Sequence, residues 1–196
     1  PARVEARVTE LLDLMELGPE AVVVIHVGGT YGDRRASAAR WVETWTGLPE
    51  HVRRRLVLEH DDLRFSAADV LWIHEHTGVR LIFDAAHALG SLHEGAPVGP
   101  QGDANVFSLS FTKLLVAGEG GVVATNDDEL ARQVRFGREY GNTGDYDSAF
   151  AGLNGRMGEL AALLALRGLP MLEAGARHRN LLADLYREEL GGVPGV

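Results

Sequence analysis

The chain has 196 residues, enough for one hydrophobic core or for two small units that share one. Hydrophobic residues make up 45% and charged residues 24%, and no apolar run approaches the roughly 20 residues that a membrane-spanning helix needs. The net charge of −9 disfavours broad attraction to nucleic acid, and there is no cysteine and no secretory signal pattern. These features exclude a disulfide scaffold and favour a cytoplasmic protein without a membrane partner.

The first part of the chain alternates helical and strand patterns. Apolar residues at helical spacing predict a first helix that ends at Gly18-Pro19, followed by a β-branched run typical of a parallel strand buried on both faces. Ser66 is a candidate N-cap, and Gly78 closes the helix that follows it. The predicted helices and strands alternate over residues 4–17, 21–27, 36–45, 55–60, 67–78 and 79–85. This alternation predicts an α/β fold with a mostly parallel sheet and helices on both faces.

After Asp84 the pattern changes to strands with short connections, predicted over residues 105–111 and 120–126. A helix is expected over residues 128–139, with acidic residues in its first turn. A segment rich in Gly, Asn and Asp, residues 141–155, predicts an ordered loop. Two C-terminal helices, near residues 156–167 and 173–190, complete the expected elements.

Lys113 is the only lysine among the 19 lysine and arginine residues. An arginine-rich composition most often reflects the composition of the genome, but that interpretation leaves the one lysine unexplained. Arginine cannot form an imine, whereas a lysine amine can lose its proton and attack a carbonyl group. Lys113 is therefore a candidate catalytic residue.

Several polar residues accompany Lys113 in an order that suits pyridoxal phosphate (PLP). This cofactor needs a lysine, a carboxylate at its pyridine nitrogen, donors for its phosphate and a group over its ring. Asp84 closes a predicted buried strand, where a carboxylate is costly unless it is paired, and His87 follows three residues later. Ser108 and Ser110 lie on the predicted strand before Lys113. Taken singly, these residues are more typical of a helix or turn cap, a core histidine and ordinary strand positions, and only the ordered set favours the functional interpretation.

Four blocks in register carry a more specific signal. FDAAHALGS, PVGPQGDANVFSLSFTK, GEGGVVATND and GLNGRMGELAALLAL resemble, in this order, the nucleotide-sugar aminotransferases of the DegT type, over about residues 74–196. These are PLP enzymes of fold type I, so the resemblance implies PLP as cofactor and a keto sugar nucleotide and an amino donor as substrates.

The same resemblance assigns roles to single residues. It implies that Lys113 is the imine lysine and proton shuttle, that Asp84 pairs with the pyridine nitrogen, and that His87 stacks on the ring. It implies further that Ser108 binds the phosphate and that Asn154 reaches the phosphate of the partner subunit's cofactor. A homodimer follows from the last of these roles.

The first eighty residues show another resemblance. HVGGTYGD and RRRLVLEHDD resemble the UV-damage endonucleases, metal-dependent DNA repair enzymes with a TIM barrel, over about residues 1–83. This resemblance implies metal ligands at His26 and Glu59, for Mn²⁺ or Zn²⁺, at the carboxyl ends of strands. Only about three of the eight barrel strands are present. A plain structural interpretation therefore stays open, in which His26 and Glu59 are buried and hydrogen-bonded.

Together the two resemblances predict residues 1–83 as a βαβαβ unit from a barrel and residues 84–196 as the PLP part of the same α/β core. The simplest interpretation is a chimera made by recombination, by design or by an assembly error. The family's N-terminal phosphate anchor and stacking aromatic residue are not visible, so we expect an incomplete fold that is inactive alone. The alternatives are a UV-damage DNA endonuclease fragment, whose partner is nucleic acid, and an inactive structural α/β domain.

Overall fold

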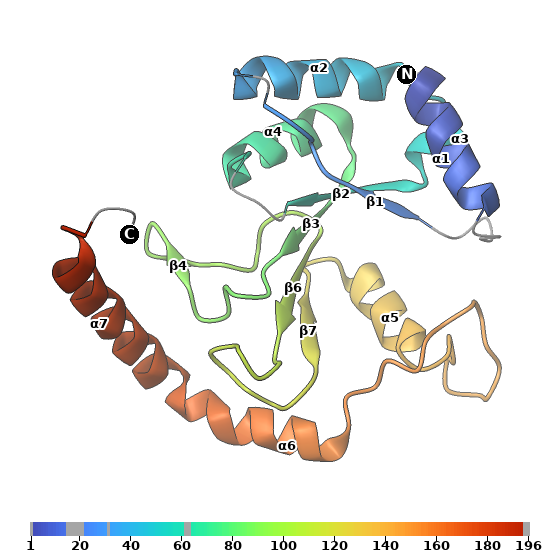
Figure 1. Cartoon of the computed structure of the whole chain (residues 1–196). Helices are drawn as coiled ribbons and strands as arrows, with labels where there is room; N and C mark the ends of the chain where they lie inside the picture. The colour runs from blue at the N-terminus through green and yellow to red at the C-terminus, as the bar shows by residue number, and fades with distance from the viewer. Residues whose placement is uncertain (1, 15–21, 31, 61–63, 194–196) are drawn as a thin grey trace. The chain divides into compact units, whose positions relative to one another are not determined.

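The computed structural model describes residues 2–14, 22–30, 32–60 and 64–193 (Figure 1). Contacts within the chain divide it into two compact units. The first unit comprises Pro1–Asp84 and Pro100–Asn105, and the second comprises Ala85–Gly99 and Val106–Val196. The sequence analysis divided the chain after residue 83 by resemblance to two families, not by compactness. That division stays a prediction. Among the described residues, no helix has the length and apolar content that crossing a bilayer requires.

The first unit is a parallel α/β layer. Strand β1 pairs in parallel with β2, and β2 pairs in parallel with β3. The first residues of β6 (Ala104–Ser108) come next in the strand order. The other elements are α1 (Ala2–Leu14), β1 (Val23–Ile25), α2 (Arg34–Thr46), α3 (Glu50–Arg53), β2 (Leu56–His60), α4 (Ala67–Thr77) and β3 (Arg80–Asp84). The mostly parallel α/β fold predicted from the sequence is therefore confirmed, while the predicted helix end at Gly18-Pro19 lies outside the described residues.

Helix α4 begins and ends where the sequence predicts. The Ser66 side chain accepts a hydrogen bond from Asp69 N, and Asp69 Oδ2 accepts one from Ser66 N at 2.8 Å, which together form a capping box. Partial burial raises the pKa of Asp69, but hydrogen bonds from Ser66 and the charge of Arg34 outweigh it and hold that pKa below its usual value. Gly78 ends the helix in the left-handed conformation, with φ of 65°.

A hydrophobic core fills the first unit. Asp33 caps the start of helix α2, and its side chain accepts a hydrogen bond from Ala36 N at 3.1 Å. The indoles of Trp41 and Trp45 stack with their centroids 5.4 Å apart, and Trp45 Nε1 donates to Thr77 O at 3.1 Å. The buried cluster comprises Val8, Leu12, Ala38, Trp45, Leu48, Val52, Leu56, Leu58, Phe65, Val70, Ile73, Val79, Leu81 and Phe83.

Strand β1 differs from its prediction in burial and in length. It spans only three residues, and Val22 and Val24 are 42% and 49% exposed. These exposed fractions show that the prediction of a strand buried on both faces was wrong, and the strand order places β1 at the edge of the sheet, next to β2. A β-branched run shows that a strand forms, but burial of its second face depends on which other elements cover it.

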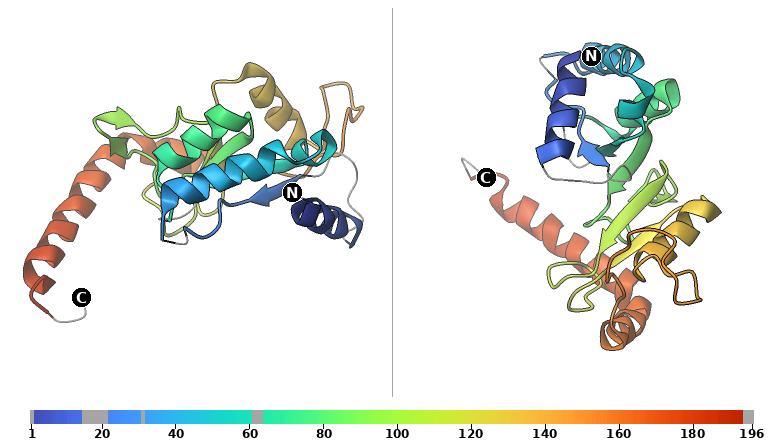
Figure 2. Two further views of the ribbon diagram at one scale, coloured as in Figure 1. Left: turned by 90° about the horizontal axis from the view of Figure 1, so that it is seen from above. Right: turned by 90° about the vertical axis from the view of Figure 1, so that its right-hand side faces the viewer.

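The second unit has short strands and long helices. It holds the rest of β6, β7 beside it, and a bent helical segment made of α6, η1 and α7 (Figure 2). Its elements are β4 (Leu92–His93), β5 (Ala96–Pro97), β7 (Gly121–Ala124), α5 (Asp128–Gly137), α6 (Glu159–Gly168), η1 (Leu169–Met171) and α7 (Leu172–Leu190). Its small core consists of Leu109, Leu115 and Ala117.

Three local features depart from the sequence analysis. The short helix α3 and the antiparallel β4–β5 hairpin were not predicted, because elements of four and two residues leave no periodic pattern. Helix α6 begins at Glu159, three residues later than expected, because Gly158 before it is extended. Residues 141–155 form the predicted loop, and an isolated bridge joins Asn142 to Ser148 within it.

Candidate functional site

The loop between β6 and β7 carries Lys113. Backbone hydrogen bonds close the loop at its base, from Leu109 N to Gly120 O at 2.9 Å and from Ala117 N to Leu109 O at 2.8 Å. At its tip, Lys113 N donates to Ser110 O at 3.0 Å, which closes a turn. Because Leu109 and Ala117 belong to the small core, the loop is anchored at its base by packing as well as by hydrogen bonds.

Two glycines shape the end of this loop. Gly118 has φ of 83° and Gly120 has φ of 146°, conformations that side chains rarely adopt. A Cβ on Gly120 would also lie 2.9 Å from Met157 Cε. From the sequence, GEGGVVATND was expected to contain a strand and to match one block of the family pattern. The role of its glycines in shaping the lysine loop was not predicted.

His87 lies at hydrogen-bond distance from the lysine. The distance from Lys113 Nζ to His87 Nε2 is 2.9 Å, with His87 exposed and Lys113 half-buried. The His87 backbone is held by a turn after β3, in which Ala88 N donates to Ala85 O at 2.9 Å. Arg179 of α7, which the sequence analysis did not single out, donates from Nη2 to Lys113 O at 3.2 Å.

The two serines lie at the end of β6. Ser108 is the last residue of the strand, and Ser110 lies beyond it, so the placement of Ser110 on the strand was wrong. Ser108 Oγ donates to Ser110 Oγ at 3.2 Å, and Ser110 N donates to Ser108 Oγ at 3.3 Å. Two adjacent hydroxyl groups of this kind can donate to an anion.

Asp84 and Asn154 are both exposed. Asp84 is the last residue of β3 and belongs to the first unit, whereas Lys113 and His87 belong to the second. Because Asp84 is exposed, the expectation of a buried carboxylate was wrong, while the pairing of Asp84 with a cation stays a prediction. Asn154 forms an isolated bridge with Glu139, a backbone contact that leaves its carboxamide on the surface.

The residues of the second unit fit the attachment of PLP. Lys113 offers a primary amine for an aldehyde, and His87 offers an imidazole next to that amine. Ser108 and Ser110 offer hydroxyl groups for a phosphate. This donor set agrees with the chemistry that a PLP enzyme requires around its lysine, while the roles of Asp84 and Asn154 stay predictions.

The residues of the alternative metal site lie close together in the first unit. His26 Nε2 is 3.7 Å from Glu59 Oε2, and their side chains are 41% and 29% exposed. The expectation that both side chains would be buried is therefore wrong. Within the described ranges, no group of three or more histidine, aspartate or glutamate side chains could hold a metal ion.

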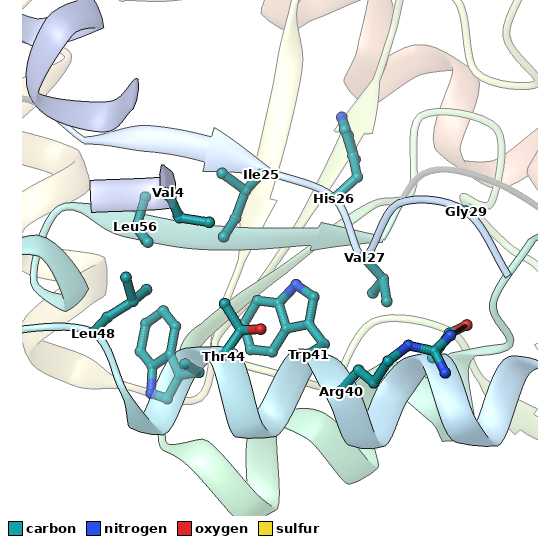
Figure 3. Close-up of a pocket in the computed structure, with 12 residues that line it drawn as sticks. Val4, Ile25, His26, Val27, Gly29, Arg40, Trp41, Thr44, Leu48 and Leu56 are labelled. Atoms are coloured by element: carbon teal, nitrogen blue, oxygen red, sulfur yellow. Dashed lines mark hydrogen bonds between the residues drawn. The ribbon is translucent and has the colours of Figure 1, made fainter. Parts of the chain in front are cut away.

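A cavity of about 320 Å³ opens in the first unit, lined by residues of α1, β1 and α2 (Figure 3). Figure 3 shows Trp41 and Thr44 facing Ile25 across it, while the His26 imidazole points away from α2. Its lining is mostly apolar, and its size is within the range of small-ligand sites. This cavity was not predicted from the sequence, because it depends on how α1, β1 and α2 pack together.

Comparison with known proteins finds two families. The model of the UV-endonuclease UvdE family matches residues 4–97. A UV DNA damage endonuclease from Bacillus pumilus is 33% identical over 87 residues, which cover 44% of this chain and 27% of that protein. The resemblance of the N-terminal part is thus confirmed, and it overlaps the second match over residues 66–97.

The second match covers more of the chain. The model of the DegT/DnrJ/EryC1/StrS aminotransferase family matches residues 66–196. A dTDP-3-amino-3,4,6-trideoxy-alpha-D-glucose transaminase from Streptomyces venezuelae is 36% identical over 121 residues, covering 61% of this chain and 32% of that protein. A DegT DnrJ EryC1 StrS aminotransferase from Brucella abortus has a crystal structure that matches with a TM-score of 0.69 at 28% identity, covering 82% of this chain and 43% of that one.

The chain therefore spans about a third of the curated aminotransferase (32%) and less than half of the solved one (43%). The solved aminotransferases also share its fold, which confirms the predicted relation to fold type I PLP transferases. Since the family model covers well over half of the chain, the protein belongs to the DegT/DnrJ/EryC1/StrS aminotransferase family.

Proposed function

We propose that the protein takes part in PLP-dependent transfer of an amino group to a keto sugar nucleotide. The observation that carries the proposal is the placement of its only lysine, at the tip of an anchored loop and 2.9 Å from an imidazole. The relative from Streptomyces venezuelae, named as a transaminase of a dTDP-linked sugar, supports the substrate class. The amino donor would be a small amino acid such as glutamate.

Each site residue has a role in this proposal. Lys113 Nζ would hold the cofactor covalently, Ser108 would bind its phosphate and Asp84 would keep its pyridine nitrogen protonated. His87 would lie against the ring. When bound, PLP supplies an electron sink that makes proton removal from the substrate carbon feasible. The free Lys113 amine then moves that proton, a task that suits an amine whose charge can change.

A second copy of the chain is part of the proposal. Asn154 is exposed, and in a homodimer it would reach the cofactor phosphate of the partner subunit. The protein would act in the cytoplasm, where sugar nucleotides are made. Because the chain spans about a third of the curated relative (32%), it would depend on further segments for full activity.

Borohydride trapping of PLP tests the proposal. Reduction after incubation with PLP should fix the cofactor on a single peptide, the one that contains Lys113, since no other lysine competes. Lys113→Ala should lose the adduct completely while retaining the circular dichroism spectrum of the wild type. Asp84→Asn should keep the adduct but release unreduced PLP faster on dialysis. Equal labelling of wild type and Lys113→Ala would contradict the proposal.

A metal site is the second candidate function, supported by the 3.7 Å approach of His26 to Glu59 and by the UvdE match over residues 4–97. In this case the protein would bind Mn²⁺ or Zn²⁺ and act on damaged DNA. Metal at 100 times its Kd should stabilise the fold by about 2.7 kcal/mol, and His26→Ala should remove that gain. If neither PLP nor metal raises the melting temperature, the third candidate, an inactive structural domain, is supported.

A further inference from the structure

The contact between Lys113 and His87 has a definite direction. At 2.9 Å, one of the two nitrogens must donate a proton and the other must accept it. A lysine ammonium group has three donor hydrogens and no acceptor, so the ammonium group donates and an unprotonated imidazole nitrogen accepts. The imidazole proton then sits on Nδ1, and the Nε2 lone pair points to the lysine.

This direction matters because an ammonium group is not a nucleophile. Before Lys113 can add to a carbonyl carbon it must lose a proton, and His87 Nε2 is the acceptor already in line with an N–H bond. Resting on the proposed function, we infer that His87 is the proton acceptor of Lys113. The Nζ–H bond breaks, an Nε2–H bond forms, and the electron pair stays on Nζ. Condensation of the free amine with an aldehyde then releases one water molecule, and His87 returns the proton to Nζ, which restores the positive charge there.

The inference goes beyond the expected role of His87 as a group that stacks on the ring. Stacking needs only the flat face of the side chain, whereas proton acceptance needs a basic nitrogen at the position of Nε2. His87→Phe keeps a flat ring and removes the base. His87→Gln keeps a hydrogen-bond acceptor that cannot be protonated near neutral pH. The two variants therefore separate the two roles.

Further ionisable side chains lie on the helix that contacts the lysine loop. Arg179 of α7, which donates to Lys113 O, adds a fixed positive charge near the lysine backbone. His178 precedes Arg179 on the same helix and is exposed, so its resonances need assignment separate from those of His87. A second positive charge on His87, next to the ammonium group, is disfavoured because like charges repel.

The first experiment follows the rate at which the wild type and both His87 variants form the PLP adduct, by absorbance, between pH 6 and pH 9. General-base catalysis is typically worth 10²–10⁴-fold, so both variants should form the adduct at least about 10-fold more slowly than wild type. His93→Gln, which removes an exposed histidine from β4, is the matched control and should react like wild type. A His87→Phe protein that reacts as fast as wild type would overturn the inference.

The second experiment needs no cofactor. Nitrogen-detected NMR of the histidines should find the Nδ1–H tautomer of His87 in the wild-type protein. Lys113→Met removes the donor at similar side-chain length, so the preference of His87 for the Nδ1–H tautomer should be lost. The same tautomer ratio in both proteins would overturn the inference even if the His87 variants were poorly folded. Failure of the proposed function looks different, because wild type would then form no adduct at Lys113 at all.

Discussion

The two units of the chain differ in how they bury apolar surface. The first has a continuous core that runs from Val8 in α1 to Phe83 in β3, whereas the buried cluster of the second consists of Leu109, Leu115 and Ala117. In the second unit α5, α6 and α7 have no buried residue, and Leu160 of α6 is 80% exposed. Lys113 therefore lies in the unit with the smaller core. Its position depends on the hydrogen bonds that close its loop rather than on a large buried cluster.

The chain offers an intrinsic probe for separating the units. All three tryptophans, Trp41, Trp45 and Trp72, belong to the first unit. Tryptophan fluorescence therefore follows unfolding of the first unit, while the far-ultraviolet circular dichroism follows the helices of both.

The largest expected effect comes from the core of the first unit. Ile73 of α4 has no exposed surface, and Ile73→Ala removes buried methyl groups and leaves a cavity. We expect a loss of about 2–5 kcal/mol in the free energy of unfolding, measured by tryptophan fluorescence in urea. Leu115→Ala, in the small core of the second unit, is the matched control and should change the circular dichroism more than the fluorescence. A fluorescence midpoint that moves as far in Leu115→Ala as in Ile73→Ala would show that the units unfold as one.

A smaller effect is expected at the start of α4. Ser66→Ala removes the side chain that caps Asp69 N, and loss of such a cap typically costs about 1 kcal/mol. Tryptophan fluorescence should report it, because Trp72 lies on this helix. Ser66→Thr, which keeps the hydroxyl group, should recover most of the loss.

The effect of Ser66→Ala should also depend on pH. The pKa of Asp69 is lowered in the folded protein, so its contribution to stability is fully present above the unfolded pKa, near about 3.9. That contribution is lost as the pH falls through the lower pKa that Asp69 has in the folded protein. The difference between wild type and Ser66→Ala should therefore be larger at neutral pH than at about pH 3; an equal difference at both would argue against the ionised capping box.

The smallest effect is expected on the exposed face of α6. Leu160→Gln replaces a side chain that is already 80% exposed, so the free energy of unfolding should change by no more than about 0.5 kcal/mol. Urea denaturation followed by circular dichroism at two protein concentrations is the appropriate measurement. A loss well above 1 kcal/mol that depends on protein concentration would show that another chain covers this face. The apolar surface of α6 would then be buried in an assembly, although it is exposed in the single chain.

Much of the fold could be predicted because its signals are local. The alternation of strands and helices, the Ser66 cap and the Gly78 end of α4 depend on side chains within one or two turns of the positions they affect. The burial of β1 and the short β4–β5 hairpin could not be predicted, because the first depends on covering elements and the second leaves no periodic pattern.

For the candidate site, the sequence alone determined which residue types are present: one lysine, a histidine and serines in a family-like order. Only the tertiary structure decided that Lys113 and His87, 26 residues apart, meet at 2.9 Å, and that Asp84 faces solvent. The physical reason is that two residues far apart in the sequence meet only if other backbone hydrogen bonds hold their loops in place. Here these are the bonds of Leu109 to Gly120 and Ala117, which fix where the lysine loop lies.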